Sequence, residues 1–150
     1  MTVLLVLLKL IHVGAAIMAV GPNATYVLWL RAAGRDRDRL AFAIRGVREM
    51  DRRLAVPAYG ILLLTGVLMV VLGVYDFGQR WLQLAIALYL AVAIAGMTVM
   101  GPAIKRFRDE AARDPNSAAF DAARATSIRY TWGSVIILLL IVTLMVTKPF

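Results

Sequence analysis

The chain of 150 residues contains no cysteine and a single histidine, His12. Without a thiol it has no disulfide, thiolate zinc site, iron–sulfur cluster or cysteine nucleophile of its own. Acidic residues are scarce, with 9 Asp and Glu against 17 Lys and Arg, and none falls inside the long apolar runs. The lack of a carboxylate in these runs argues against a proton- or sodium-coupled transporter of the usual kind. A glycine-rich phosphate loop, a catalytic triad and a carboxylate pair are also missing.

Hydrophobic residues are abundant, at 61% of the sequence with a mean hydropathy of +0.77. They form four runs that reach or approach the roughly 20 residues needed to cross a bilayer as a helix. A membrane barrel needs alternating polar and apolar residues, and these runs do not alternate. The sequence therefore predicts an all-α fold, a four-helix antiparallel transmembrane bundle in a single integral membrane domain, residues 1–150. The predicted spans cover residues 3–30, 54–75, 81–104 and 131–147.

Basic residues gather in two of the three connections between spans, and this asymmetry predicts the orientation of the chain. They are Arg31, Arg35, Arg37, Arg39, Arg45, Arg48, Arg52 and Arg53, then Lys105, Arg106, Arg108, Arg113, Arg124 and Arg129. The positive-inside rule places both connections in the cytoplasm and both termini outside. The same connections hold most acidic residues, and mixed signs suit solvated helices and anionic lipid headgroups better than nucleic acid.

The ends of the helices are marked by turn residues. Gly34 is expected to end the first helix, and residues 39–54 are expected to lead helically into the second span. The third helix is expected to extend to about Arg113, and the fourth to begin near Ser117 after an Asp-Pro-Asn turn. The sequence thus predicts cytoplasmic helical extensions. The first run is expected to remain as a span, because no basic segment precedes it and it outlasts a signal-peptide core.

A weak internal repeat relates the two halves of the chain. The segment "MAVGP" at residues 18–22 is similar to "TVMGP" at residues 98–102. This likeness predicts a tandem repeat of two helical hairpins. The Gly-Pro pairs are interpreted first as packing kinks, and a discontinuous helix lining a site is the alternative.

Polar and small residues share one face of the first predicted span. They are Lys9, His12, Ala16, Ala19, Asn23 and Tyr26, at helical spacings of three and four. Lipid offers such groups nothing, so this face is expected to point into the bundle. Lys9 lies near the outer boundary, where its side chain can extend to the surface.

The sequence leaves two interpretations of His12 open. In one, a neutral imidazole forms a hydrogen bond to a neighbouring helix, with Gln83 or Tyr89 of the third span as its partner. In the other, His12 is an axial ligand to haem iron or, less favoured, binds a metal ion. With a single histidine, the sixth coordination position of the haem iron is empty, or it is filled by a second protomer or by a methionine. The candidate methionines are Met18, Met69, Met97 and Met100.

The order and spacing of several segments resemble one bacterial protein family. They are "LLKLIHVGAAIMAVG" at residues 7–21, "VPAYGILLLTGVLM" at 56–69, "GPAIKR" at 101–106 and "MVTKP" at 145–149. Together they are similar to the predicted four-span integral membrane proteins known as the domain of unknown function 2269. The resemblance covers the whole chain and implies a multi-pass protein of the bacterial inner membrane. It implies no particular reaction.

A more distant similarity concerns the first span alone. The Lys-x-x-His spacing of Lys9 and His12 resembles the first helix of the HemJ-type membrane protoporphyrinogen oxidases, where that histidine is implicated in haem binding, and CopD-like copper-resistance proteins. The Tyr-Leu-Pro-Arg segment of the oxidases is replaced here by residues 21–24, Gly-Pro-Asn-Ala. The resemblance therefore implies haem held by His12, rather than the oxidase reaction. Our first hypothesis is haem b bound by His12, with Lys9 and Tyr26 on the same face as supporting residues. The alternative is a structural or partner-binding bundle without cofactor, in which the chain forms a homodimer or binds another protein.

Overall fold

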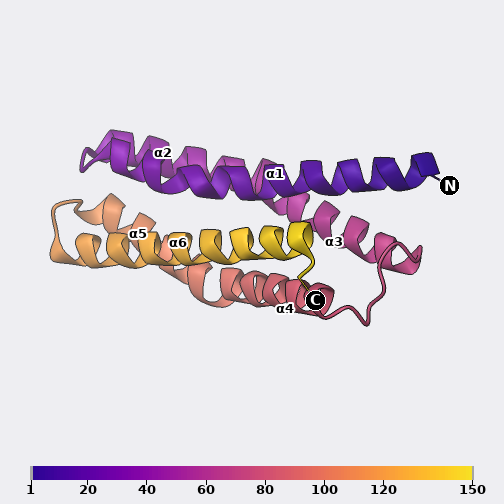
Figure 1. The fold of residues 1–150 in the computed structure, drawn as a ribbon. Coiled ribbons are helices and arrows are strands. Elements are labelled where there is room, and N and C mark those ends of the chain that lie inside the picture. The colour runs from indigo at the N-terminus through magenta and orange to yellow at the C-terminus, as the bar shows by residue number, and fades with distance from the viewer. Residues whose placement is uncertain (1, 150) are drawn as a thin grey trace.

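The computed structural model describes residues 2–149, and all regular secondary structure in this part of the chain is helical, with no strand. Four of its helices are long and apolar enough to cross a membrane (Figure 1). The predicted all-α fold with four apolar helices is therefore confirmed. The elements are α1 (Thr2–Ala33), α2 (Arg37–Met50), η1 (Asp51–Ala55), α3 (Val56–Val71), α4 (Arg80–Ala95), η2 (Gly96–Met100), α5 (Gly101–Arg113) and α6 (Ala118–Thr147). The segments α2, η1 and α3 form one continuous long helix, and α4, η2 and α5 form another.

The predicted helical extensions are present, and their ends have the expected chemistry. Gly34 follows α1 with a φ of 63°, a conformation that glycine adopts without steric cost. Ser117 caps α6, because its hydroxyl oxygen accepts a hydrogen bond from the Phe120 amide at 3.1 Å. The second span ends at Val71 rather than at the predicted Tyr75, because Gly73 turns the chain with a φ of 70°. The predicted tandem repeat stays a prediction.

Two of the long helices each contain one wide turn just before a proline. The segments η1 and η2 are π-helical, and they end two residues before Pro57 and Pro102, respectively. Proline has no amide hydrogen and its ring displaces the carbonyl four residues earlier. The chain widens instead, so that the Val56 amide donates to the Asp51 carbonyl, five residues back. In α1 the helix continues through Pro22 without such a turn.

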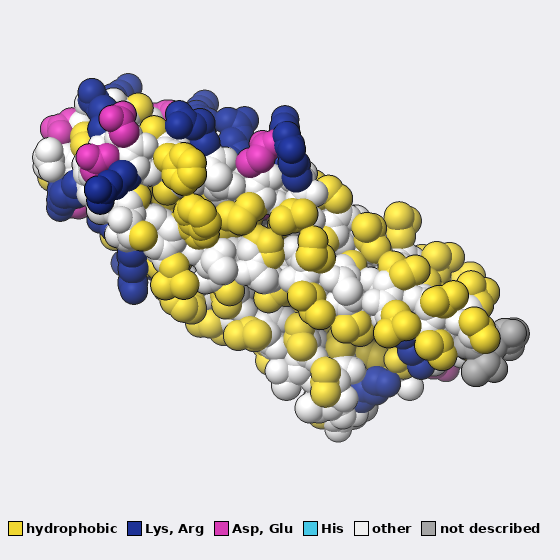
Figure 2. All heavy atoms as spheres, turned by 90° about the horizontal axis from the view of Figure 1, so that it is seen from above, with side chains coloured by type: hydrophobic (Ala, Val, Ile, Leu, Met, Phe, Trp, Pro, Cys, Tyr) yellow, Lys and Arg dark blue, Asp and Glu magenta, His cyan; other side chains and the backbone are white. Residues whose placement is uncertain are grey.

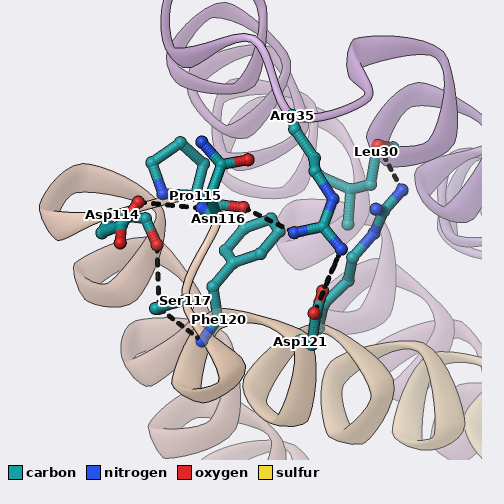
Figure 3. A network of polar contacts seen from close by, with 9 residues as sticks. Leu30, Arg35, Asp114, Pro115, Asn116, Ser117, Phe120 and Asp121 are labelled. Atoms are coloured by element: carbon teal, nitrogen blue, oxygen red, sulfur yellow. Dashed lines mark hydrogen bonds and ion pairs between the residues drawn. The ribbon is translucent and has the colours of Figure 1, made fainter.

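The best-packed part of the molecule is the end that carries the α1–α2 and α5–α6 turns, here called the basic end. Its core consists of Leu30, Ala33, Leu40, Ala43, Phe107, Ala111, Phe120 and Ala123. The Phe107 and Phe120 rings pack with centroids 5.5 Å apart. Figure 3 shows Arg35 reaching from the α1–α2 turn to the α5–α6 turn, where it binds the Asp121 carboxylate and the Pro115 carbonyl. The two helical hairpins are thereby joined at the basic end.

The rest of the molecule exposes apolar side chains (Figure 2). Lys and Arg gather over the basic end, and yellow side chains cover most of the remaining length. The helix from Arg80 to Arg113 is the least covered of the four long helices. An exposed surface of this kind is what lipid contact requires, because hydrocarbon chains take the place of a protein core. The opposite end of the molecule, with the N-terminal residues and the α3–α4 loop, is called the terminal end below.

Candidate functional site

The polar face predicted on the first span lies against the second span. α1 packs along α3 and η1. The polar side chains of α1 pair in succession with residues of this neighbour: Lys9 with Tyr75, His12 with Thr65, Asn23 with Tyr59 and Tyr26 with Asp51. We call these four pairs the polar seam. The partner's residue number falls at every step as the number on α1 rises, so the two helices run in opposite directions.

His12 lies in the half of the polar seam that is nearer the terminal end. Its Nδ1 atom is 2.7 Å from the hydroxyl oxygen of Thr65, which is buried. The same hydroxyl donates to the Ile61 carbonyl at 2.6 Å. A hydroxyl has a single hydrogen, so with that hydrogen on Ile61 it accepts a hydrogen bond from Nδ1–H. In this arrangement of hydrogens His12 is protonated on Nδ1, and Nε2 keeps its lone pair.

The imidazole of His12 packs beside a glycine. A Cβ atom placed on Gly66 would lie 3.5 Å from the His12 Cε1 atom, which is ordinary contact distance. Gly66 directly follows Thr65, so one turn of α3 supplies both the hydrogen-bond acceptor and the space for the ring. The predicted partners Gln83 and Tyr89 were wrong, since their side chains donate to the carbonyls of Phe77 and Tyr59.

Asn23 and Tyr59 continue the seam toward the basic end. The Asn23 amide nitrogen donates to the Ala19 carbonyl at 2.8 Å and to the Tyr59 hydroxyl at 3.0 Å. Tyr89 of α4 donates to the Tyr59 carbonyl at 2.8 Å, and the two tyrosine rings meet edge to face. Three long helices are thus linked at this level.

Asp51 is the polar partner that the sequence did not indicate. Its carboxylate accepts a hydrogen bond from the buried Tyr26 hydroxyl at 3.4 Å. In the sequence Asp51 belongs to a charged connection and has no mark of an interior residue. The wide turn η1 begins at Asp51 and places it against α1. Only the register between the two helices, set by Pro57 and the α1–α2 turn, identifies it as a partner of Tyr26.

Lys9 belongs to a different group of side chains at the terminal end. Its ammonium lies 5.8 Å from the centroid of the Tyr75 ring, and the Lys148 ammonium lies 4.6 Å from the same centroid. The Tyr75 and Trp81 rings are perpendicular, with centroids 5.4 Å apart. A cation over an aromatic face is attracted by the ring quadrupole. Lys9 therefore anchors the end of α1 to the aromatic residues that follow α3.

The three residues predicted to form one site are spread along the seam. Lys9 contacts Tyr75 and His12 contacts Thr65, while Tyr26 lies roughly 20 Å further along the helix axis from His12. Within residues 2–149 no group of three His, Cys, Asp or Glu residues is placed to hold a metal ion. What the arrangement does is connect two helices at four levels through hydrogen bonds and one cation–aromatic contact.

Comparison with protein families matches residues 6–149 to the family described as "Predicted integral membrane protein (DUF2269)". The chain belongs to this family. Comparisons with curated proteins and with solved structures find no match to the chain. DUF2269 membership confirms that the protein is an integral membrane protein, in agreement with the four apolar helices, and assigns no reaction. The similarity of Lys9 and His12 to the HemJ-type oxidases and CopD-like proteins stays a prediction from the sequence.

Proposed function

We propose that the chain is a structural, partner-binding membrane bundle in which His12 ties α1 to α3. The observation that carries this proposal is the polar seam, where Lys9, His12, Asn23 and Tyr26 of α1 each have a partner on or beside α3. The proposal places the basic end in the cytoplasm and both termini outside a bacterial inner membrane, supported by the positive-inside rule and the family resemblance. The exposed apolar length of α4 is then the surface available to lipid or to a partner protein.

Haem binding is the second candidate, and the contact between His12 Nδ1 and the Thr65 hydroxyl is the observation that favours it. Histidines that bind metals usually donate from the other ring nitrogen to a neighbouring acceptor, which fixes the ring. The Nδ1–H···Thr65 contact is such an arrangement, and it leaves the Nε2 lone pair as the donor to iron. A bound haem would supply one-electron chemistry, while His12 and Thr65 would hold and orient it. The Lys9 ammonium lies over Tyr75 and the Tyr26 hydroxyl bonds to Asp51, so a supporting role of these two residues toward haem stays a prediction.

Substituting His12 distinguishes the two candidates. The side-chain amide nitrogen of asparagine can take the position of the imidazole Nδ1 atom, and that of glutamine can take the position of Nε2. His12→Asn keeps the donor to Thr65 and is expected to unfold near the native temperature in mild detergent. His12→Ala and His12→Gln are expected to lose roughly 0.5–1.5 kcal/mol of stability, as membrane hydrogen bonds typically contribute.

The absorption spectrum of protein purified from haem-replete cells is the second measurement on the same variants. The structural proposal predicts a spectrum without a Soret band that is unchanged after haem is added. A stoichiometric Soret band in the native chain, absent in both His12→Asn and His12→Gln, would establish haem binding and refute the cofactor-free bundle. Thr143→Val is the control for effects of expression and purification on a variant. The Thr143 side chain is exposed, and its hydroxyl donates only to the Leu139 carbonyl of the same helix.

A further inference from the structure

A row of arginines on α2 and η1 borders an open hollow at the edge of the basic end. The hollow has a volume of about 390 Å³ and is lined by Arg45, Arg48, Glu49 and Arg52. The three arginines are spaced by three and four residues, so they share one face of a continuous helix. The guanidinium groups of all three arginines therefore lie along one concave surface.

Two arginines of this hollow, Arg45 and Arg48, differ from most others at the basic end in having no internal partner among residues 2–149. Arg35 binds Asp121, Arg37 donates to two carbonyls of α5, and Arg124 donates to the Leu30 carbonyl. Within residues 2–149, Arg45 and Arg48 form no ion pair or hydrogen bond through their side chains. Glu49 is already engaged, since its carboxylate pairs with both Arg52 and Arg53. The hollow thus holds two guanidinium groups whose positive charge no carboxylate in contact offsets.

Contacts on either side of the hollow place it where the apolar length of the molecule begins. On one side of it along the helix, Phe42 packs against Trp29 of α1 with ring centroids 6.5 Å apart, and both rings are exposed. On the other side, Asp51 contacts Tyr26. Exposed Trp and Phe rings beside a charged segment are typical of the membrane–water interface. Arg45 and Arg48 lie between these two contacts, at the level where the exposed aromatic rings predict the membrane–water interface.

We propose that this hollow binds the phosphate of an anionic phospholipid headgroup. Guanidinium groups match phosphate oxygens with paired N–H donors, and arginine is the preferred residue for such recognition. The exposed Leu54 and Val56 side chains follow Arg52 toward the apolar length of the helix and offer contact for the upper acyl chains. A soluble phosphate compound would gain nothing from these side chains, so the lipid is the favoured source of the phosphate.

Native mass spectrometry of the full chain in mild detergent tests this proposal. The detergent micelle is titrated with dioleoyl phosphatidylglycerol, and dioleoyl phosphatidylcholine is titrated in parallel as the zwitterionic lipid. One retained phosphatidylglycerol per chain is expected to predominate. The double variant Arg45→Gln, Arg48→Gln is expected to weaken its binding roughly 10- to 30-fold, since each basic side chain near an anionic headgroup contributes a factor of several.

The control variant removes the same charge elsewhere on the basic end. Arg39→Gln with Arg106→Gln changes two exposed arginines that have no internal partner among residues 2–149 and do not line this hollow. It is expected to retain phosphatidylglycerol as the native chain does. Equal loss in both double variants, no loss in either, or equal retention of phosphatidylcholine would overturn the proposal. Competition by glycerol 3-phosphate at the concentration of the lipid would show a soluble phosphate site and would overturn it as well.

Discussion

Replacing Phe120 with alanine is expected to lower the free energy of unfolding of the basic end by about 3–5 kcal/mol. Phe120 is 0% exposed and packs on Phe107, and the Arg35 guanidinium lies over its ring with 6.0 Å to the centroid. The variant leaves a cavity among four helices that are otherwise joined there mainly by alanines and arginine contacts. This is the largest single effect that the structure predicts.

Limited trypsin digestion and thermal unfolding in mild detergent measure the effect of Phe120→Ala. Cleavage in the arginine-rich helices of the basic end is expected to be much faster, with a lower unfolding midpoint. Phe42→Ala is the matched control, because Phe42 is 63% exposed and loses little buried contact. Equal sensitivity of the two variants would contradict the location of the core.

Replacing Ala19 with leucine is expected to separate α1 from α3 and to destabilise the hairpin by about 1–3 kcal/mol. Ala19 is 0% exposed, and its carbonyl accepts the hydrogen bond of Asn23. Buried alanines lie on both helices, Ala15 and Ala19 on one side and Ala55 and Ala58 on the other. Within a membrane, small residues allow the close backbone approach on which helix association depends. A larger side chain at Ala19 would increase the distance between α1 and α3 along the polar seam.

The readout for Ala19→Leu is the midpoint of thermal unfolding in detergent. Ala24→Leu serves for comparison, because Ala24 is an exposed residue of the same helix and offers room for the added atoms. It is expected to behave as the native chain. An Ala24→Leu variant as unstable as Ala19→Leu would show that leucine harms α1 for a reason other than packing against α3.

The sequence predicted the helices well because their ends depend on local chemistry. Gly34 ended α1 and Ser117 capped α6, since a left-handed residue and a hydroxyl cap act within a few residues of their position. The wide turns before Pro57 and Pro102 were not foreseen. Proline indicates that a helix must adjust, but whether it kinks or widens depends on the neighbouring helices.

The candidate site was predicted less completely, because it depends on which helices are neighbours. The face shared by Lys9, His12, Asn23 and Tyr26 could be recognised from helical periodicity alone. The partners of these residues could not be recognised. The hydrogen-bond partner of His12 was expected in the third span, whereas it is Thr65 in the second. Asp51 was missed because a carboxylate in a charged segment resembles its solvated neighbours until the register between α1 and η1 is known.

The central claim is that His12 holds α1 against α3 through Thr65, and a double-mutant cycle tests it most directly. His12→Ala, Thr65→Val and the double variant are compared with the native chain by unfolding in one detergent. The account predicts a coupling energy of about 0.6–1.7 kcal/mol, the range found for hydrogen bonds between membrane helices. Effects that add without coupling would contradict it, because the two side chains would then act independently.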